Sequence, residues 1–306
     1  MKEGFADRLA QASVARQSCL VVGIDPVIEK LPREVAAIVG EGASGGSGFT
    51  ARASAALGLF ATRVIGAVAD TAVAVKPNTA FFERFGAAGW DALLETCRAA
   101  RRAGLLVIAD GKRGDIGSTA EAYADAFLGD TEDTLGPWVD AVTVNPYMGT
   151  DSVRPFIEKA REGGKGVFVL VRTSNPSAAE VQDLDSGGRP LYLRMADLVR
   201  GWGTDASGSS GLSSVGAVVG ATAPAEARAI REVLPGAMFL VPGYGAQGGS
   251  AEGLRACFLP GGRGAVVNAS RSILYAHEKR GGDWVEAVRE AAIQARDEIE
   301  AVRAAT

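Results

Sequence analysis

Residues 105–120 read LLVIADGKRGDIGSTA, a short apolar run followed at once by a cluster of charges. The run is continuously apolar, which is typical of a strand buried on both faces of a parallel sheet. Residues i and i+2 of a strand lie on one face, so Asp110 and Lys112 should point the same way where this strand ends. A carboxylate and an ammonium held this close perturb each other strongly, and such pairs often mark functional sites.

Seven further runs of the same kind lie on either side of this one, separated by segments with helical spacing. They occupy residues 19–25, 71–76, 140–145, 166–173, 215–222, 237–243 and 264–270. Helical spacing is clearest at 89–104, 224–236 and 283–305, the last a long amphipathic segment. Eight strands alternating with helices predict an α/β fold, a (β/α)8 TIM barrel formed by residues 1–306 as a single domain. A doubly wound open sheet is the alternative at this point.

The composition agrees with one large folded domain and argues against some classes of binding partner. Of the 306 residues, 47% are hydrophobic and 22% charged, and the net charge of -4 argues against a nucleic-acid binder. The N-terminus lacks an apolar signal segment, and no apolar run approaches the roughly 20 residues of a membrane span. We therefore expect a cytoplasmic protein without a membrane partner. Glycine- and serine-rich stretches near 41–50 and 203–212 are expected to be mobile loops of the same domain.

The cysteines and the single histidine exclude several chemistries. Cys19, Cys97 and Cys257 are far apart and form no CxxC pair, so we expect them to be buried and reduced. His277 is the only histidine and is expected near the end of a helix. One histidine excludes a centre with several histidine ligands and argues against a Ser-His-Asp triad.

Polar residues gather where the other predicted strands end. Asp25, Lys76 and Asn145 each close a strand, and residues 173–175 follow the fifth. In a barrel, functional groups collect at this end. The loops at 242–249 and 268–273 combine glycines with Arg271, and backbone N–H groups and a guanidinium are good phosphate ligands. The sequence therefore predicts a phosphate site after the seventh and eighth strands.

These motifs resemble the orotidine 5′-phosphate decarboxylase family, most closely its longer bacterial subgroup with a KRGDIG signature. The resemblance covers nearly the whole chain through GIDP (23–26), VKPNTAFFE (75–83), DGKRGDIGSTA (110–120), VNPYMG (144–149), RTSNPS (172–177), PGYGAQGG (242–249) and SRSI (270–273). It implies a carboxy-lyase that converts orotidine 5′-phosphate to UMP and CO2 in de novo pyrimidine biosynthesis, working as a homodimer. It implies no cofactor and no metal, and the sequence has no G-x-G-x-x-G that follows a strand and opens a helix.

The resemblance also implies roles for individual residues. Lys112 would protonate C6 of the pyrimidine, Asp110 would face the substrate carboxylate, and Lys76 would complete the charged array and contact the ribose. Asp115 would be offered across the dimer interface, with Ile116 and Thr119 beside it. The remaining substrate ligands would be Asp25 for the ribose, Ser174 for the pyrimidine edge, and Pro242, Gln247 and Arg271 in the phosphate loops. Ser270 departs from the family, since many members have glycine there.

Two other functions stay open on the sequence alone. A sister barrel, a metal-dependent sugar-phosphate decarboxylase or aldolase, would share the D-x-K-x-x-D core, although Lys76 would repel its divalent ion. A non-catalytic nucleotide-binding protein could keep the barrel and the phosphate loops, although the charged residues favour chemistry. A Schiff-base aldolase is disfavoured because Asp110 beside Lys112 keeps the amine protonated.

Overall fold

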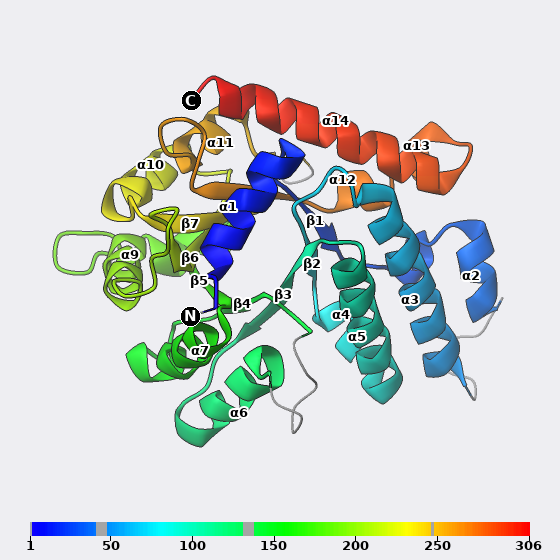
Figure 1. Cartoon of the computed structure of the whole chain (residues 1–306), viewed down its shortest axis with the longest axis horizontal. Helices are drawn as coiled ribbons and strands as arrows, with labels where there is room; N and C mark the ends of the chain where they lie inside the picture. Colours follow the sequence, from blue (N-terminus) through cyan, green and yellow to red (C-terminus); the bar gives the residue numbers. More distant parts are fainter. Residues whose placement is uncertain (1, 41–47, 131–137, 246–247) are drawn as a thin grey trace.

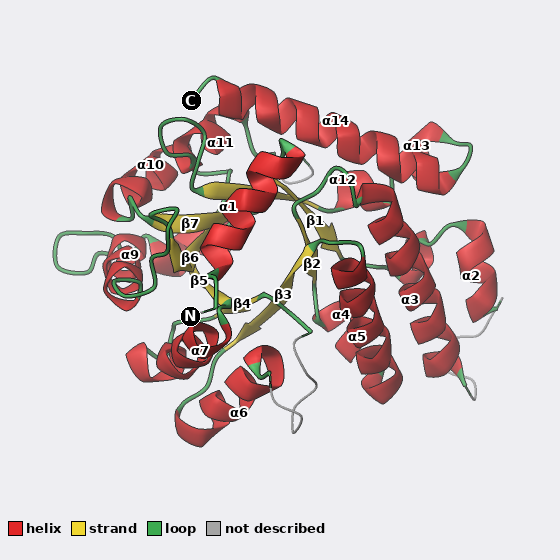
Figure 2. Ribbon diagram, viewed as in Figure 1, coloured by secondary structure: helices red, strands yellow, loops and turns green. Residues whose placement is uncertain are grey.

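The computed structural model describes residues 2–40, 48–130, 138–245 and 248–306. Eight parallel strands form a closed barrel in the order of the chain, and helices surround it (Figures 1 and 2). The strands are β1 (Leu20–Ile24), β2 (Ala74–Pro77), β3 (Leu106–Arg113), β4 (Ala141–Val144), β5 (Gly166–Arg172), β6 (Ser213–Val219), β7 (Ala237–Val241) and β8 (Ala265–Ala269). All eight predicted strands are present, and the (β/α)8 prediction is confirmed. The pairing of β1 with β8 closes the sheet, which excludes the open doubly wound alternative.

The helices follow the strands in the expected alternation. They are α1 (Phe5–Arg16), α2 (Arg33–Val39), α3 (Phe49–Val68), α4 (Ala80–Glu83), α5 (Gly86–Arg102), α6 (Gly117–Leu128), α7 (Thr150–Gly163), α8 (Ala179–Gln182), α9 (Leu191–Trp202), α10 (Pro224–Val233), α11 (Ala251–Cys257), α12 (Arg271–Leu274), α13 (His277–Arg280) and α14 (Trp284–Ala304), with 3-10 turns η1 (Ile28–Lys30) and η2 (Pro176–Ala178). The predicted helices appear as α5, α10 and α14. His277 begins the four-residue helix α13 and so lies within its last turn, which agrees with the position expected near a helix end.

Every residue of β1, β7 and β8 is buried, as expected for strands covered on both faces. Helix α1 lies across one end of the barrel (Figure 1), where Phe5 packs edge-on against Phe168 with ring centroids 5.8 Å apart. A Cβ at Gly166 would lie 2.3 Å from the Phe5 ring, so glycine is needed for this close approach. Since Gly166 begins β5, α1 covers the amino-terminal end. The carboxyl ends of the strands are therefore left for a site.

Helix α3 is more apolar than the sequence analysis expected. It has 20 residues and is the one described helix long and apolar enough to cross a membrane by length and composition. Its apolar side chains pack within the protein instead, with Ala53, Leu57 and Phe60 among its buried residues. Phe60 stacks on Trp284 of α14 at a centroid separation of 5.4 Å. Its composition thus fits a core helix of the outer layer.

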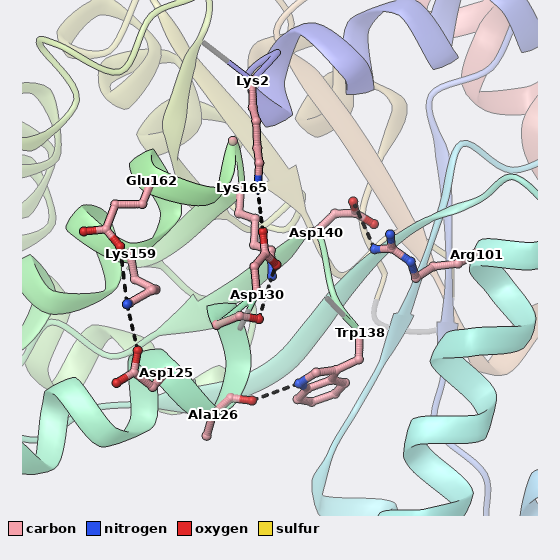
Figure 3. A network of polar contacts seen from close by, with 12 residues as sticks. Lys2, Arg101, Asp125, Ala126, Asp130, Trp138, Asp140, Lys159, Glu162 and Lys165 are labelled. Carbon is pink, nitrogen blue, oxygen red and sulfur yellow. Dashed lines mark hydrogen bonds and ion pairs between the residues drawn. The ribbon is translucent and has the colours of Figure 1, made fainter. Parts of the chain in front are cut away.

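Near the start of β4 and β5, polar contacts connect segments that are far apart in the sequence (Figure 3). Asp130 accepts hydrogen bonds from Lys2 at 2.9 Å and from Lys165 at 2.8 Å. Asp140, which is buried, accepts from the backbone N–H of Val107 at 2.9 Å and from Arg8 at 2.6 Å. A buried carboxylate needs such donors to offset the loss of water. These contacts join α1 to the barrel strands.

The three cysteines are free and buried, as predicted. Within the predicted loop near 203–212, the backbone N–H groups of Ser209 and Ser210 donate to Asp7 at 2.9 and 2.8 Å. The mobility expected of this loop stays a prediction. Of the stretch near 41–50, residues 41–47 lie outside the described residues, and α3 begins at Phe49.

Candidate active site

A cavity of about 450 Å³ opens at the carboxyl ends of the strands. Seven of the predicted site residues line it: Asp25, Lys76, Asp110, Lys112, Ser174, Pro242 and Arg271. They come from the ends of β1, β2, β3, β5, β7 and β8 or from the loops that follow, which is where barrel enzymes build their sites. These seven residues therefore lie together at the end of the barrel where the sequence analysis expected a site.

Asp110 lies between two ammonium groups at the centre of this site. Its Oδ2 atom accepts from Lys76 Nζ and its Oδ1 atom from Lys112 Nζ, each at 2.5 Å. The side chains of Asp110 and Lys76 are only 9% and 6% exposed, whereas that of Lys112 is 48% exposed. Both lysines line the cavity, and Lys112 is the more exposed of the two.

Asp110 and Lys76 stabilise each other in their ionised forms. Burial alone would raise the pKa of Asp110, but Lys76 and Lys112 outweigh it and the pKa lies well below its usual range. Burial would lower the pKa of Lys76, but Asp110 and then Asp25 raise it above its usual value. Asp110 is thus an anion and Lys76 a cation at neutral pH. Lys76 and Asp110 supply fixed charge at buried positions, where electrostatic effects are strongest.

A backbone bulge presents Lys112 to the cavity. Ala109 of β3 pairs with Val142 of β4, yet the next pair joins Arg113 to Val144. Three residues of β3 therefore face one residue of β4, Thr143. Lys112 adopts a left-handed conformation with φ of 45°, which L-residues avoid unless the surroundings enforce it.

Thr143 is a site residue that the sequence analysis missed. Its hydroxyl accepts from the backbone N–H of Lys112 at 3.0 Å and donates to Asp110 Oδ1 at 3.1 Å. The signal was a polar residue within the otherwise apolar run at 140–145. The ladder shift that gives it these partners could not be seen in the sequence.

Asp115, Ile116 and Thr119 do not line the described cavity. Asp115 lies in the loop after β3, where its Oδ1 atom accepts from the N–H of Ile116 at 2.8 Å. Ile116 is 51% exposed and Thr119 is exposed on α6. Within one chain, the cavity therefore holds three of the four charges predicted for the array.

Asp25 faces the cavity with an unused acceptor. Its Oδ1 atom is buried and has no hydrogen-bond partner among the described residues, and a buried carboxylate oxygen of this kind is suited to a ligand hydroxyl. Tyr275 fixes the backbone around it by donating to the carbonyl of Asp25 at 2.8 Å and accepting from the N–H of Val27 at 2.9 Å. Burial raises the pKa of Tyr275 to about 12, so the hydroxyl is protonated at neutral pH. Sequence reasoning missed Tyr275, which is far from Asp25 in the chain.

The predicted phosphate side of the cavity is formed by the loops after β7 and β8. Pro242 and Arg271 line it, whereas Gln247 lies outside the described residues. Ser270 also lines it and accepts from Asn268 Nδ2 at 3.2 Å. A Cβ at Gly23 would lie 1.9 Å from Ser270 Oγ, so Gly23 makes room for the Ser270 side chain.

The loop after β5 presents Ser174, the residue predicted to read the pyrimidine edge. Ser174 lines the cavity with its neighbours Thr173 and Asn175. Gln182 of α8 accepts from the N–H of Thr173 at 3.0 Å and donates to its hydroxyl at 2.7 Å. These bonds hold the backbone directly before Ser174.

The described residues contain no cluster of three or more His, Cys, Asp or Glu side chains able to hold a metal ion. The cavity instead combines two lysines and Arg271 with Asp25 and Asp110. Such a set is suited to an anionic substrate with hydroxyl groups.

Comparison with known proteins agrees with this geometry. Residues 57–282 match the family described as Orotidine 5′-phosphate decarboxylase / HUMPS. The chain is 43% identical to the orotidine 5′-phosphate decarboxylase of Rhodopirellula baltica over 96% of this chain and 98% of the relative. It is 41% identical to that of Deinococcus radiodurans over 98% of each chain.

A solved structure shows the same fold. The structure of Leishmania donovani OMP decarboxylase superposes with a TM-score of 0.74 at 36% identity, covering 98% of this chain and 99% of the other. The likeness in sequence and in fold extends over nearly the full length of each protein. The chain belongs to the orotidine 5′-phosphate decarboxylase family.

Proposed function

We propose that this protein is a carboxy-lyase that converts orotidine 5′-phosphate to UMP and CO2 in de novo pyrimidine biosynthesis, in the cytoplasm. The observation that carries the proposal is the array of Lys76, Asp110 and Lys112 on one wall of the cavity. Membership of the family and the printed names of its relatives support the same reaction.

Loss of CO2 from C6 leaves an electron pair in the plane of the pyrimidine ring, where the π system cannot delocalise it. The Lys112 ammonium stabilises this charge as it develops and then gives a proton to C6, forming the C–H bond of UMP and leaving a neutral amine. Lys112 is assigned this role because its ammonium is accessible, whereas Lys76 is buried beneath Asp110. The reaction needs no cofactor.

One charge contact does not account for catalysis. A pair of unit charges about 4 Å apart interacts by about 4 kcal/mol at an effective dielectric of about 20. Enzymes typically lower barriers by about 8–23 kcal/mol. Asp110 holds the Lys112 ammonium in place, and binding energy from the distant phosphate contributes the remainder.

The substrate ligands follow the walls of the cavity. Arg271 and Gln247 bind the phosphate beside Pro242, and Asp25 binds a ribose hydroxyl through its unused oxygen. Ser174 reads the pyrimidine edge. A loop serine at position 270 keeps a backbone N–H for the phosphate, as glycine does.

The working form is a homodimer in which Asp115 and Thr119 reach the neighbouring site. Exposed apolar side chains on α6, on the loop that precedes it and on the loop after β4 support this arrangement. They are Ile116, Tyr123, Tyr147 and Met148, with Tyr147 83% exposed. Apolar surface of this kind marks interaction sites more often than free surface.

The test is the loss of orotidine 5′-phosphate absorbance on addition of the wild-type protein, with and without EDTA. We expect equal turnover in both, because the residues do the chemistry. Activity lost in EDTA would favour the metal-dependent sister barrel. Tight UMP binding without CO2 release would favour a non-catalytic nucleotide-binding protein.

A further inference from the structure

The bulge at the end of β3 leaves backbone groups without a regular ladder partner. Between the pairs Ala109 with Val142 and Arg113 with Val144, the residues of β3 outnumber those of β4 by two. Bulges of this kind bend a strand and aim a side chain, and they are frequent next to active sites. Here the bulge contains both Asp110 and Lys112.

The left-handed backbone of Lys112 needs support from its surroundings. At φ of 45° it is one of two described non-glycine residues with a positive φ, the other being Gln17 at the end of α1. The bulge is packed closely on its far side, where a Cβ at Gly114 would lie 2.9 Å from the carbonyl oxygen of Asn145. Only the contacts of the bulge can therefore hold Lys112 in this conformation.

Thr143 makes two of those contacts with a single hydroxyl. The backbone N–H of Lys112 can only donate and the Asp110 carboxylate can only accept, so the hydroxyl accepts from the first at 3.0 Å and donates to the second at 3.1 Å. Thr143 is 1% exposed, so water cannot readily replace it. The same Asp110 oxygen also receives Lys112 Nζ at 2.5 Å. Thr143 thus connects the backbone of Lys112 to the carboxylate oxygen that binds its ammonium.

We propose that Thr143 is a positioning residue that aims the Lys112 ammonium at the reacting carbon. The hydroxyl holds Lys112 in its left-handed conformation and sets the orientation of the Asp110 carboxylate to which the ammonium is bound. Without it, the Lys112 N–H loses its partner and the backbone relaxes toward a right-handed or extended conformation. A displacement of about 1 Å in a catalytic group lowers a rate by about 100-fold. This inference rests on the proposed function, because it concerns the same proton donor.

Three variants test the hydroxyl separately from the packing. Thr143→Val keeps the shape and removes the hydroxyl, whereas Thr143→Ser keeps the hydroxyl and removes a methyl group. Thr96→Val is the matched control, because Thr96 is also buried and its hydroxyl donates to Ala92 within α5, away from the cavity. We expect Thr143→Val to lower kcat by about 10- to 100-fold with KM within about threefold. Thr143→Ser and Thr96→Val should stay within about threefold of wild type in both constants.

Crystal structures of the same variants measure the positioning itself. Lys112 should keep its left-handed φ in Thr143→Ser and leave it in Thr143→Val. If Thr143→Val does not fold, Thr143→Cys replaces it, since the thiol is close to serine in shape but a weak donor and acceptor. Equal kcat in Thr143→Val and Thr96→Val, or a serine variant as slow as the valine variant, would overturn the proposal.

The two proposals fail in different ways. Wild-type protein that releases no CO2 from orotidine 5′-phosphate contradicts the proposed function. In that case the crystal structures still decide the role of Thr143. An unchanged Lys112 backbone in the hydroxyl-free variant overturns it, and a shifted backbone supports it.

Discussion

Replacing Asp110 with asparagine removes the anion between two ammonium groups and should destabilise the fold. Each ion pair has an N–O distance of 2.5 Å, which corresponds to about 7 kcal/mol of Coulomb attraction at an effective dielectric of about 20. Burial offsets much of this, and breaking a buried pair costs about 3–5 kcal/mol because one charge is left unpaired. That charge is Lys76, whose side chain is 6% exposed. We expect Asp110→Asn to lower the free energy of unfolding at pH 7 by about 3–5 kcal/mol.

The loss of stability in Asp110→Asn should depend on pH in a characteristic way. In the wild type, the lowered pKa of Asp110 stabilises the fold above about pH 4 and this is lost as pH falls. The raised pKa of Lys76 stabilises it below about pH 10 and this is lost as pH rises further. The wild type should therefore change little between pH 6 and 9. In Asp110→Asn, burial lowers the pKa of Lys76, the unfolded state binds more protons, and stability should rise from pH 7 to 9.

Urea unfolding followed by circular dichroism at pH 7 and pH 9 measures both effects. The double variant Asp110→Asn with Lys76→Met is the control, because it removes the unpaired charge and should recover at least half of the lost stability at pH 7. A loss below about 1 kcal/mol, or a deficit that is the same at both pH values, would refute the argument that Asp110 neutralises a buried Lys76.

Three further predictions follow from other contacts. Arg271→Ala should lower kcat/KM for orotidine 5′-phosphate by at least about 100-fold while leaving turnover of a phosphate-free substrate nearly unchanged; equal losses on both would show a structural role. Tyr275→Phe removes the hydroxyl that fixes Asp25 and Val27 and should raise the KM by about tenfold in steady-state assays, and an unchanged KM would contradict this. Arg231→Met removes the hydrogen bonds that the guanidinium donates to four buried carbonyls, those of Cys257, Leu234, Ala237 and Gly264, of which Leu234 and Gly264 keep a backbone donor. Thermal and urea unfolding should show a loss of about 2–4 kcal/mol with kcat retained, and a loss below about 1 kcal/mol would show that these bonds contribute little.

The strands were predictable because burial on both faces leaves a direct mark on the sequence. Each of the eight apolar runs became a strand, and β3 continues past its predicted end to Arg113. The continuation reflects the bulge, which depends on the partner strand β4 and not on the residues of β3 alone. Helix α3 was harder to judge, since its 20 residues pass for a membrane span until their packing against α14 is known.

The site residues that directly follow strands could be predicted from the sequence. Those that meet their partners only through tertiary contacts could not. Asp110 and Lys112 are two residues apart, so the strand period predicted that they lie on one face, although in the structure the bulge also sets the direction of Lys112. Thr143 and Tyr275 meet their partners only through the closed barrel, at separations of 31 and 250 residues. The expected contribution of Asp115 and Thr119 to a second chain stays a prediction, and so does the role of Gln247.

The central claim is that Lys112 delivers the proton to C6. Its most direct measurement is the kcat/KM of Lys112→Ala for orotidine 5′-phosphate, together with the dissociation constant of UMP by calorimetry. The account predicts a loss of at least about 10⁴-fold in kcat/KM, because both charge stabilisation and proton transfer are removed, with UMP affinity within about tenfold of wild type. A variant that keeps more than about one hundredth of the wild-type kcat/KM would contradict it.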